Sequence, residues 1–266
     1  MSDQHIQDIY EKARTWVLEA GARLRSKMHE PLVIETKSDA NDLVTEMDQE
    51  TERFFAEHIR ETYPDHRVMG EEGFGDEIED LDGTVWIVDP IDGTMNFVHQ
   101  KQNFAISVGI FQDGVGVIGL IYDVMADSLY HAIKGQGAYK NAEKLDQLKP
   151  VQLDSSILCL NSFWAIENKR VEEEGTQALV RKVRGTRSYG SAALEFAYVA
   201  EGSIDAYITM RLAPWDIEAG IILVNEVGGR TTQADGSDLD MVGKNSIITG
   251  NPSIHQEIID DYITLK

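Results

Sequence analysis

The sequence predicts a layered α+β protein, an α-β-α-β-α sandwich in which two β-sheets alternate with layers of helix. Three observations predict this class. Apolar residues at helical spacing fill the start of the chain, β-rich runs follow one another between residues 104 and 133, and strand-like and helical patterns alternate after Pro150. With 266 residues, the chain lies near the upper limit of a single domain. We therefore expect one compact unit of two lobes, residues 1–150 and residues 151–266.

Two helices are predicted at the start of the chain. The first has an apolar face at spacings of three and four, and we expect Pro31 to end it. That face consists of Ile6, Ile9, Ala13, Trp16, Val17, Ala20, Leu24 and Met28. The second helix begins at Thr45, with Asp48 as the partner in a capping box, and Tyr63-Pro64 closes it.

Strands are predicted next. Val68-Met69 forms a short strand that leads into Gly70-Glu71-Glu72, and Val85 to Val88 forms a buried one. Three β-rich runs then cover residues 104–111, 115–124 and 128–133. We expect these runs to form an antiparallel meander.

The second lobe alternates strands and helices. Strands are expected at 157–160, 183–189 and 206–210, and helices at 166–182, 191–200 and 216–227. The last of these helices is expected to end at Gly228-Gly229, because glycine commonly follows a helix C-terminus. This order places a second sheet among helices.

The charge of the chain excludes some partners. Its 46 acidic and 24 basic residues give a formal charge of −22, which repels a phosphate backbone, so no nucleic-acid partner is expected. A small anionic substrate is compatible with this charge if bound cations reverse its sign locally. The N-terminus lacks the apolar core of a signal peptide, and no apolar run approaches a membrane span. We expect a cytoplasmic protein with no membrane partner.

The most informative segment is Asp89-Pro90-Ile91-Asp92-Gly93-Thr94, which follows the apolar strand directly. Pro90 has no N–H to donate to a sheet, and Gly93 permits a sharp turn, so both carboxylates fall at a strand end. Mg²⁺ prefers such oxygen ligands. The segment therefore predicts either a divalent-metal site or a simple capped turn.

Further acidic residues occupy comparable positions at the ends of elements. Asp48 lies at a helix start, Glu71 follows a strand, and Asp216 follows Trp215. Each also has a structural explanation: Asp48 caps its helix, Glu71 belongs to a solvated charge pair, and Asp216 is favoured by the helix dipole. Taken singly, none of them establishes a site.

Four segments together carry a resemblance to a known family. They are Lys37 with Asp42-Leu43-Val44-Thr45 and Asp48; Gly70-Glu71-Glu72; Trp86-Ile87-Val88-Asp89-Pro90-Ile91-Asp92-Gly93-Thr94-Met95-Asn96-Phe97; and Pro214-Trp215-Asp216-Ile217-Glu218-Ala219-Gly220. In this order the chain resembles the inositol monophosphatase family, within the lithium-sensitive, magnesium-dependent phosphatase superfamily that includes fructose-1,6-bisphosphatases. The resemblance covers most of the chain and implies the sugar-phosphatase fold and a homodimer.

The resemblance also implies roles for residues. One Mg²⁺ is held by Glu71, Asp89 and the Ile91 carbonyl, a second by Asp89, Asp92 and Asp216, and a third, weaker ion lies near Glu71. Thr94, oriented by Asp48, helps to activate water together with Glu71, and the backbone N–H groups of Gly93 and Thr94 bind phosphate. Ser191, Ala192 and Asp216 contact the substrate. The implied reaction is direct attack of metal-activated water on a phosphomonoester of the inositol-1-phosphate type.

The substrate is less well defined by the sequence. The family's inositol-binding glutamate, seven residues before Asp216, corresponds to Thr209. Arg211 lies two residues further on and either projects into the same pocket or lies on the surface. In the pocket it favours a second anionic group, because guanidinium pairs with phosphate or carboxylate. The sequence therefore leaves three alternative substrates: fructose-1,6-bisphosphate, NADP and nucleotide 3′-phosphates.

Two rival functions are also considered. Haloacid-dehalogenase-type phosphatases end a strand with aspartates at D-x-D spacing, whereas here Pro90-Ile91 separates Asp89 from Asp92. A scaffold that acts through protein partners is the other rival, and the intact set of acidic residues argues against a decayed site.

Overall fold

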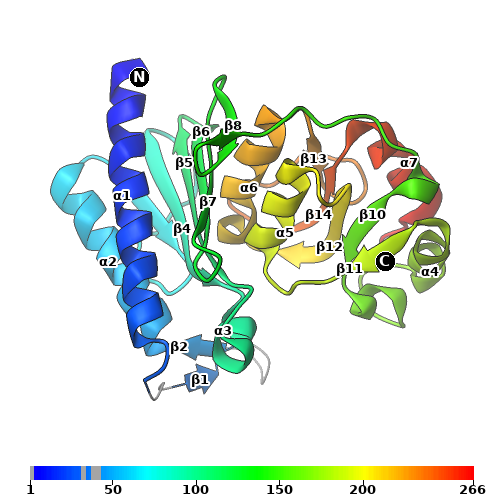
Figure 1. The fold of residues 1–266 in the computed structure, drawn as a ribbon, viewed down its shortest axis with the longest axis horizontal. Coiled ribbons are helices and arrows are strands. Elements are labelled where there is room, and N and C mark those ends of the chain that lie inside the picture. Colours follow the sequence, from blue (N-terminus) through cyan, green and yellow to red (C-terminus); the bar gives the residue numbers. More distant parts are fainter. Residues whose placement is uncertain (1–2, 31–33, 37–42) are drawn as a thin grey trace.

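The computed structural model describes residues 3–30, 34–36 and 43–266, which form five layers (Figure 1). Helices α1 (Asp3–Lys27) and α2 (Glu46–Thr62) cover one face of a seven-stranded sheet. Helices α5 (Ala192–Glu201) and α6 (Pro214–Glu226) lie between this sheet and a five-stranded one. Helices α4 (Glu173–Lys182) and α7 (Pro252–Tyr262) cover the far face. The predicted α-β-α-β-α sandwich is confirmed.

The seven-stranded sheet contains the predicted meander. Its strands, in spatial order, are β3 (Arg67–Gly70), β4 (Thr84–Asp92), β5 (Ala105–Gln112), β6 (Val115–Asp123), β7 (Ser128–Ile133), β8 (Gly137–Lys140) and β9 (Glu143–Lys144). Only β3 and β4 are parallel within this sheet. Because parallel strands end at the same edge, the segments that follow β3 and β4 lie side by side.

The five-stranded sheet has a mixed topology. Its strands, in spatial order, are β11 (Gly185–Arg187), β10 (Ile157–Leu160), β12 (Ala206–Leu212), β14 (Asn245–Gly250) and β13 (Arg230–Thr232). Strand β10 is parallel to both of its neighbours, and β14 is antiparallel to both of its own. A small antiparallel pair, β1 (Ile34–Thr36) and β2 (Leu43–Thr45), precedes α2.

Three predicted elements have different bounds in the structure. The helix expected from residue 166 begins at Glu173, because the Asn168 side chain accepts from the N–H groups of Arg170 and Val171 and holds a turn. A 3₁₀ helix, η2 (Ser162–Ala165), precedes that turn. The strand expected over 183–189 covers only 185–187, and the helix expected from Asp216 begins two residues earlier at Pro214. Pro31 lies outside the described residues, and α1 ends at Lys27.

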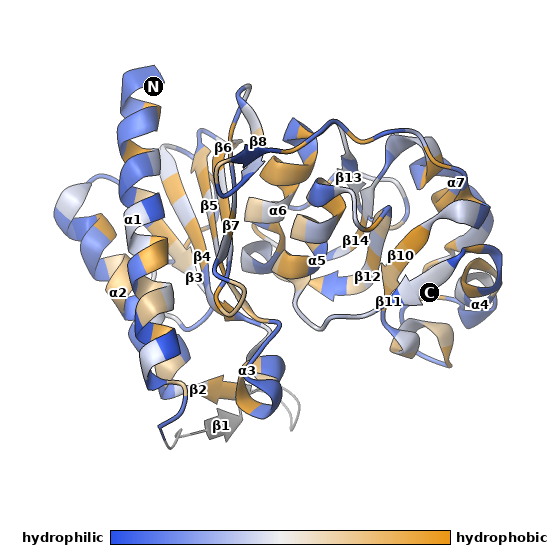
Figure 2. Cartoon of the chain, in the orientation of Figure 1, coloured by the Kyte–Doolittle hydropathy of each residue, from blue (hydrophilic) through white to orange (hydrophobic). Residues whose placement is uncertain are grey.

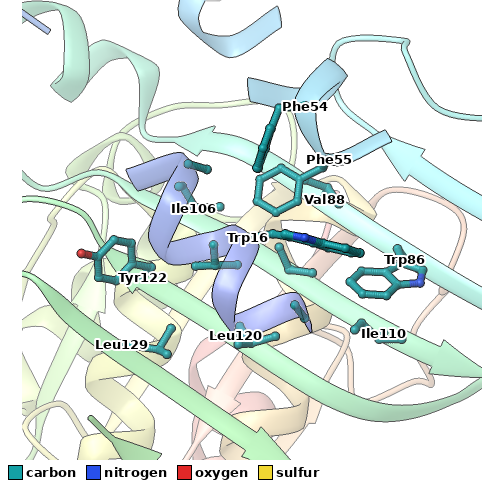
Figure 3. Close-up of a cluster of buried hydrophobic side chains, with 14 of the residues drawn as sticks. Trp16, Phe54, Phe55, Trp86, Val88, Ile106, Ile110, Leu120, Tyr122 and Leu129 are labelled. Atoms are coloured by element: carbon teal, nitrogen blue, oxygen red, sulfur yellow. The ribbon is translucent and has the colours of Figure 1, made fainter. Parts of the chain in front are cut away.

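The first helix packs as its apolar spacing predicts. Its inner face contacts the seven-stranded sheet, and the hydropathy colouring shows apolar residues on that side (Figure 2). Trp16 lies against Trp86 of β4 with ring centroids 5.6 Å apart, beside Phe55 of α2 (Figure 3). Burial of each such side chain contributes roughly 1.5–3 kcal/mol. This packing holds α2 and β4, which both lead into the site.

Helix α6 packs very closely between the two sheets. A Cβ atom at Gly119 of β6 would lie 2.6 Å from the Ala219 carbonyl oxygen, and one at Gly220 would lie 2.3 Å from Phe196 of α5. The absence of side chains at these two glycines permits the close approach. As a result, the first turn of α6, which carries Asp216, is fixed against the end of β4. Among the described residues, no helix combines the length and hydrophobicity needed to cross a membrane.

Candidate active site

A β-bulge at the end of β4 brings Asp89 and Asp92 together. Asp89 pairs with Ser107, and Asp92 pairs with Ala105, so three steps along β4 match two along β5. In a regular strand, residues three apart point to opposite faces, but the extra residue turns both carboxylates to the same side. Pro90 lies within this bulge, where its missing N–H costs no ladder hydrogen bond. The predicted strand-end motif therefore forms one carboxylate pair.

Asp216 completes a cluster of three carboxylates. Within the described ranges, ligand oxygens of Asp89, Asp92 and Asp216 all lie within 4.8 Å of one another. Asp89 and Asp92 are buried, and Asp216 is half-buried in the first turn of α6, where its carboxylate accepts from the Ala213 N–H at 2.6 Å. The long-range packing of α6 against β4 and β5 thus joins two motifs that are far apart in the sequence.

The electrostatics of this cluster favour a bound cation. Burial, followed by the charges of Glu71 and Asp92, raises the pKa of Asp89 well above its usual range. Burial and the charge of Asp92 do the same to the pKa of Asp216. Three ionised carboxylates at this separation repel one another, and hydrogen bonds alone do not offset the charge. A hard divalent cation with oxygen ligands fits this donor set and removes the repulsion.

Asp92 is fixed by the start of helix α5. Its carboxylate accepts hydrogen bonds from the Ser191 hydroxyl, from the Ala192 N–H at 3.2 Å and from the Ala193 N–H at 2.9 Å. Ser191 also caps α5. Burial raises the pKa of Asp92 to about 6, and these three hydrogen bonds oppose that rise. The structure therefore brings Ser191 and Ala192 to the predicted site, with their polar groups directed at a carboxylate.

Asp48 combines the two roles that its position suggests. Its carboxylate accepts from the Thr45 N–H at 2.8 Å and from the Thr45 hydroxyl, which completes the predicted capping box of α2. Its other oxygen lies 3.1 Å from Thr94 Oγ1, and the same hydroxyl lies 3.1 Å from the Ile91 carbonyl oxygen. Burial raises the pKa of Asp48 to about 6. A carboxylate with this pKa is suited to accept a proton near neutral pH.

Glu71 reaches the cluster from the neighbouring strand. Gly70 of β3 pairs with Val88 of β4 in parallel, so Glu71, which directly follows β3, lies next to Asp89 of β4. Glu71 stands outside the three-carboxylate group in the part of the chain that is described, yet its charge raises the pKa of Asp89. Glu71 thus borders the cluster as the motif order predicts.

Sequence reasoning missed Glu52, which braces the Glu71 loop. Glu52 is fully buried on α2 and accepts from the Glu72 N–H at 2.5 Å and the Phe74 N–H at 2.7 Å. A Cβ atom at Gly70 would lie 2.3 Å from the Glu52 carboxyl carbon, so a side chain there would displace the Glu52 carboxylate. Glu52 lies one helical turn after Asp48, and an acidic residue on the buried face of a helix was a usable signal.

A hollow of about 340 Å³ opens beside the cluster. Asp92 and Asp216 line its base, and its walls are formed by Asn161, Phe163, Trp164, Ser188, Gly190, Ser191, Ala192, Glu195, Tyr207, Thr209 and Leu212. Glu195, also missed from the sequence, accepts from the Tyr189 N–H at 2.7 Å, and burial raises its pKa to about 7. We call this space the active-site hollow.

Thr209 and Arg211 are separated by a second bulge. Thr209 pairs with Ile247 and Leu212 with Asn245, so three steps along β12 match two along β14. The extra residue returns Leu212 to the side of Thr209 and turns Arg211 to a different one. Accordingly, Thr209 and Leu212 line the active-site hollow, and Arg211 lines a separate hollow with Lys244. Lys37 and Asp42 lie outside the described residues.

Comparison with known proteins gives a consistent match. The model of the inositol monophosphatase family matches residues 5–263. Inositol-1-monophosphatase of Bacillus subtilis (strain 168) is 58% identical over 256 residues, which cover 96% of this chain and 97% of that protein. A crystal structure of SaIMPase-II with bound inositol monophosphate is 44% identical with a TM-score of 0.87, covering 96% and 93% of the two chains. An IMPase/NADP phosphatase complexed with Mg²⁺ and phosphate is 27% identical with a TM-score of 0.88, covering 96% and 95%.

Proposed function

The chain belongs to the inositol monophosphatase family, and we propose that it hydrolyses inositol monophosphates in a reaction that depends on Mg²⁺. The observation that carries the proposal is the convergence of Asp89, Asp92 and Asp216 beside the Asp48–Thr94 pair. It joins a site for divalent cations to a group that accepts a proton. Both are required to attack a phosphomonoester with water near neutral pH.

We assign the metal ligands from the observed cluster and the family pattern. Glu71, Asp89 and the Ile91 carbonyl would hold one ion, Asp89, Asp92 and Asp216 a second, and a third ion would lie near Glu71. When bound, the magnesium ions lower the pKa of water and neutralise charge on the phosphoryl group. The raised pKa of the carboxyl groups of Asp89 and Asp216 supports this assignment, because burial, followed by neighbouring negative charge, disfavours their ionised forms, and bound cations favour those forms.

The remaining roles belong to groups of the chain itself. Thr94 Oγ1 orients water and passes a proton to Asp48, whose carboxylate is held in place by the cap of α2. The backbone N–H groups of Gly93 and Thr94 hold phosphate oxygens at the turn where Gly93 adopts a φ of 91°. Water attacks phosphorus directly as the bond between phosphorus and the ester oxygen breaks, and the leaving alkoxide takes a proton from solvent. No phosphoenzyme is proposed, because the carboxylates of the cluster are assigned to the metal ions.

The walls of the active-site hollow suit a polyol. Asn161, Ser188, Tyr207 and Thr209 bring amide and hydroxyl groups to the hollow, and such groups pair with sugar hydroxyls. The solved relative with bound inositol monophosphate supports this substrate class. Since Arg211 faces a different hollow, it gives no support to a second anionic group on the substrate at this site. Inositol-1-phosphate is therefore the substrate that the geometry favours.

The test is phosphate release from a panel of phosphomonoesters. We expect inositol-1-phosphate to give a higher kcat/KM than fructose-1,6-bisphosphate, NADP or a nucleotide 3′-phosphate. Chelation should abolish release, added Mg²⁺ should restore it, and lithium should inhibit it. Release that persists in excess chelator would contradict the metal assignment, and a preference for the bisphosphate would contradict the substrate.

We also propose that the enzyme is a homodimer, as the family resemblance implies. The chain has a mass of 29.8 kDa, so a light-scattering mass of twice this value is expected. A mass equal to one chain would contradict the proposal.

A further inference from the structure

A second hollow, of about 280 Å³, lies beside β12 and is lined by five basic residues (Lys169, Arg170, Arg211, Lys244 and Lys266). The rest of its lining consists of Met210, Gln233, Asn245, Ser246 and Leu265, so no carboxylate side chain lines it. We call it the basic hollow. It shares no lining residue with the active-site hollow. Such a concentration of positive charge is unexpected in a chain with a formal charge of −22.

Within the described ranges, the close ion pairs of these cations are confined to Lys266. Lys266 pairs with Glu173 at 3.0 Å and with Glu172 at 3.5 Å. For Lys169, Arg170, Arg211 and Lys244, the described part of the chain supplies no carboxylate within 4.0 Å. Among the described residues, Lys169, Arg170, Arg211 and Lys244 thus form no close ion pair, and they leave a local excess of positive charge around the hollow.

The backbone holds the cations in place. Arg211 lies on β12 and Lys244 directly precedes β14, and these two strands are paired. On the opposite side, the Lys266 N–H donates to the Arg170 carbonyl at 2.9 Å, and Val171 bridges to Leu265. The β12 bulge turns Arg211 toward this space. The positive groups therefore come from separate segments that are joined by main-chain hydrogen bonds.

We propose that the basic hollow is a second anion site, which binds a small molecule carrying two or more phosphate or carboxylate charges. Guanidinium and ammonium groups from separate segments of the lining fit separate anionic groups of one ligand, and Met210 and Leu265 add apolar surface to the lining. The volume lies at the lower end of that of small-molecule pockets, which suits a compact ligand. The overall negative charge disfavours a nucleic acid as the occupant.

This site has its own lining residues and does not rest on the proposed function, but the charge of Lys244 acts on Asp216 and lowers its pKa against the larger effect of burial. The two hollows meet along β12, where Thr209 and Leu212 belong to one and Met210 and Arg211 to the other. An anion held by Arg211 thus contacts the strand that forms a wall of the active-site hollow.

The test is titration calorimetry of the full-length, magnesium-loaded protein with inorganic pyrophosphate. Four proteins are compared: the wild type, Asp89→Asn, Arg211→Gln/Lys244→Gln, and the matched control Lys134→Gln/Arg184→Gln, whose two cations are exposed and lie outside the basic hollow. The charge change is the same in both double variants. All four side-chain changes of the double variants are on exposed residues, and a thermal melt checks that folding is retained.

We expect binding to persist in Asp89→Asn and in the control, and to weaken by at least about tenfold in Arg211→Gln/Lys244→Gln, since hydrogen bonds to charged groups are lost. Binding that disappears in Asp89→Asn but survives in Arg211→Gln/Lys244→Gln would overturn the proposal, because the anion would then occupy the metal site alone. Equal weakening in both double variants, or no binding to the wild type, would overturn it as well.

Discussion

The two sides of the active site differ in charge and in how they are held. The side built by α2, β3 and β4 presents carboxylates, several of them buried and braced by hydrogen bonds: Asp48, Glu71, Asp89 and Asp92. The side built by η2, α5 and β12 presents mainly hydroxyl groups and aromatic rings, including Phe163, which is 53% exposed, together with the Glu195 carboxyl group, whose pKa burial raises to about 7. Asp216 reaches the first side from α6.

This difference separates the reaction from the choice of substrate. In the proposed reaction, the charged groups hold cations and move protons, and small errors in their placement are expected to change the rate of the chemical step. Neutral groups on an open wall mainly bind the organic part of the substrate. Variants on the carboxylate side should therefore change kcat or metal affinity, and variants on the hydroxyl side should change KM.

Apart from the metal ligands, the largest effect on the rate is expected at Thr94. Thr94→Val keeps the shape of the side chain but removes the hydroxyl that contacts Asp48 and the Ile91 carbonyl. We expect kcat for inositol-1-phosphate to fall by about 10²-fold or more, in the range of general acid–base catalysis, with a small change in KM. Steady-state kinetics measures kcat and KM separately. A rise in KM with unchanged kcat would show that Thr94 behaves like a residue of the hydroxyl side.

The carboxylate side should also make the stability of the protein depend on pH and Mg²⁺. In the metal-free fold, burial raises the pKa of Asp48 and Asp92 from 3.8 to about 6. Between these values the folded state binds more protons than the unfolded state, so these two groups add stability at low pH that is lost as the pH rises through about 6. The loss is at most about 3 kcal/mol for each group.

Magnesium should offset this loss, because it binds the ionised carboxylates. We expect the rise in Tm on adding Mg²⁺ to be larger at about pH 7 than at about pH 5. Calorimetric scans in matched buffers measure it. An equal rise at both values would mean that protons and cations do not compete for the cluster.

Glu52 should affect metal binding more than chemistry. In Glu52→Gln, the remaining side-chain oxygen can accept from only one of the N–H groups of Glu72 and Phe74. The new NH₂ group then faces the second N–H, which loses its acceptor. Residues that position ligands typically change metal affinity by 10–100-fold, so we expect the Mg²⁺ concentration for half-maximal activity to rise about tenfold. The matched control, Glu57→Gln, changes an exposed residue of the same helix. A lowered kcat at saturating Mg²⁺ would show that Glu52 does more than position the loop.

The smallest effect is expected on the hydroxyl side. Thr209→Val removes one hydroxyl from the wall of the active-site hollow and preserves its volume. Loss of one neutral hydrogen bond to a polyol should raise KM for inositol-1-phosphate about 3- to 10-fold and leave kcat nearly unchanged. A fall in kcat of the size expected for Thr94→Val would remove the distinction between the two sides.

Local patterns predicted the carboxylate side well. The capping box at Asp48, the apolar strand before Asp89 and the sharp turn at Gly93 are short-range features, and all three are present. They depend on residues within a few positions of one another, so the sequence alone contains the information. The layered fold followed in the same way from helical spacing and from the meander.

The hydroxyl side of the active site was harder to predict, because its arrangement depends on the register of strand pairing. The distance between Thr209 and Arg211 is two residues, which in a regular strand places both on one face. Because of the bulge before Leu212, Thr209 and Arg211 point to different sides of the strand, and Arg211 lines the basic hollow. A bulge depends on pairing with β14, more than thirty residues later in the sequence, so no local pattern reveals it. For Glu52, the partners belong to a loop after another strand, so the sequence offered only its position on the buried face of α2 as a signal.

The central claim is that buried carboxylates of the β4 end hold the cations on which hydrolysis depends. Asp89→Asn tests it most directly, with the exposed Asp261→Asn as the matched control. We expect phosphate release from inositol-1-phosphate at saturating Mg²⁺ to fall by about 10³-fold or more in Asp89→Asn, since loss of metal stabilisation costs several kcal/mol in the transition state, and to stay unchanged in the control. Near-normal, magnesium-dependent release by Asp89→Asn would contradict the claim.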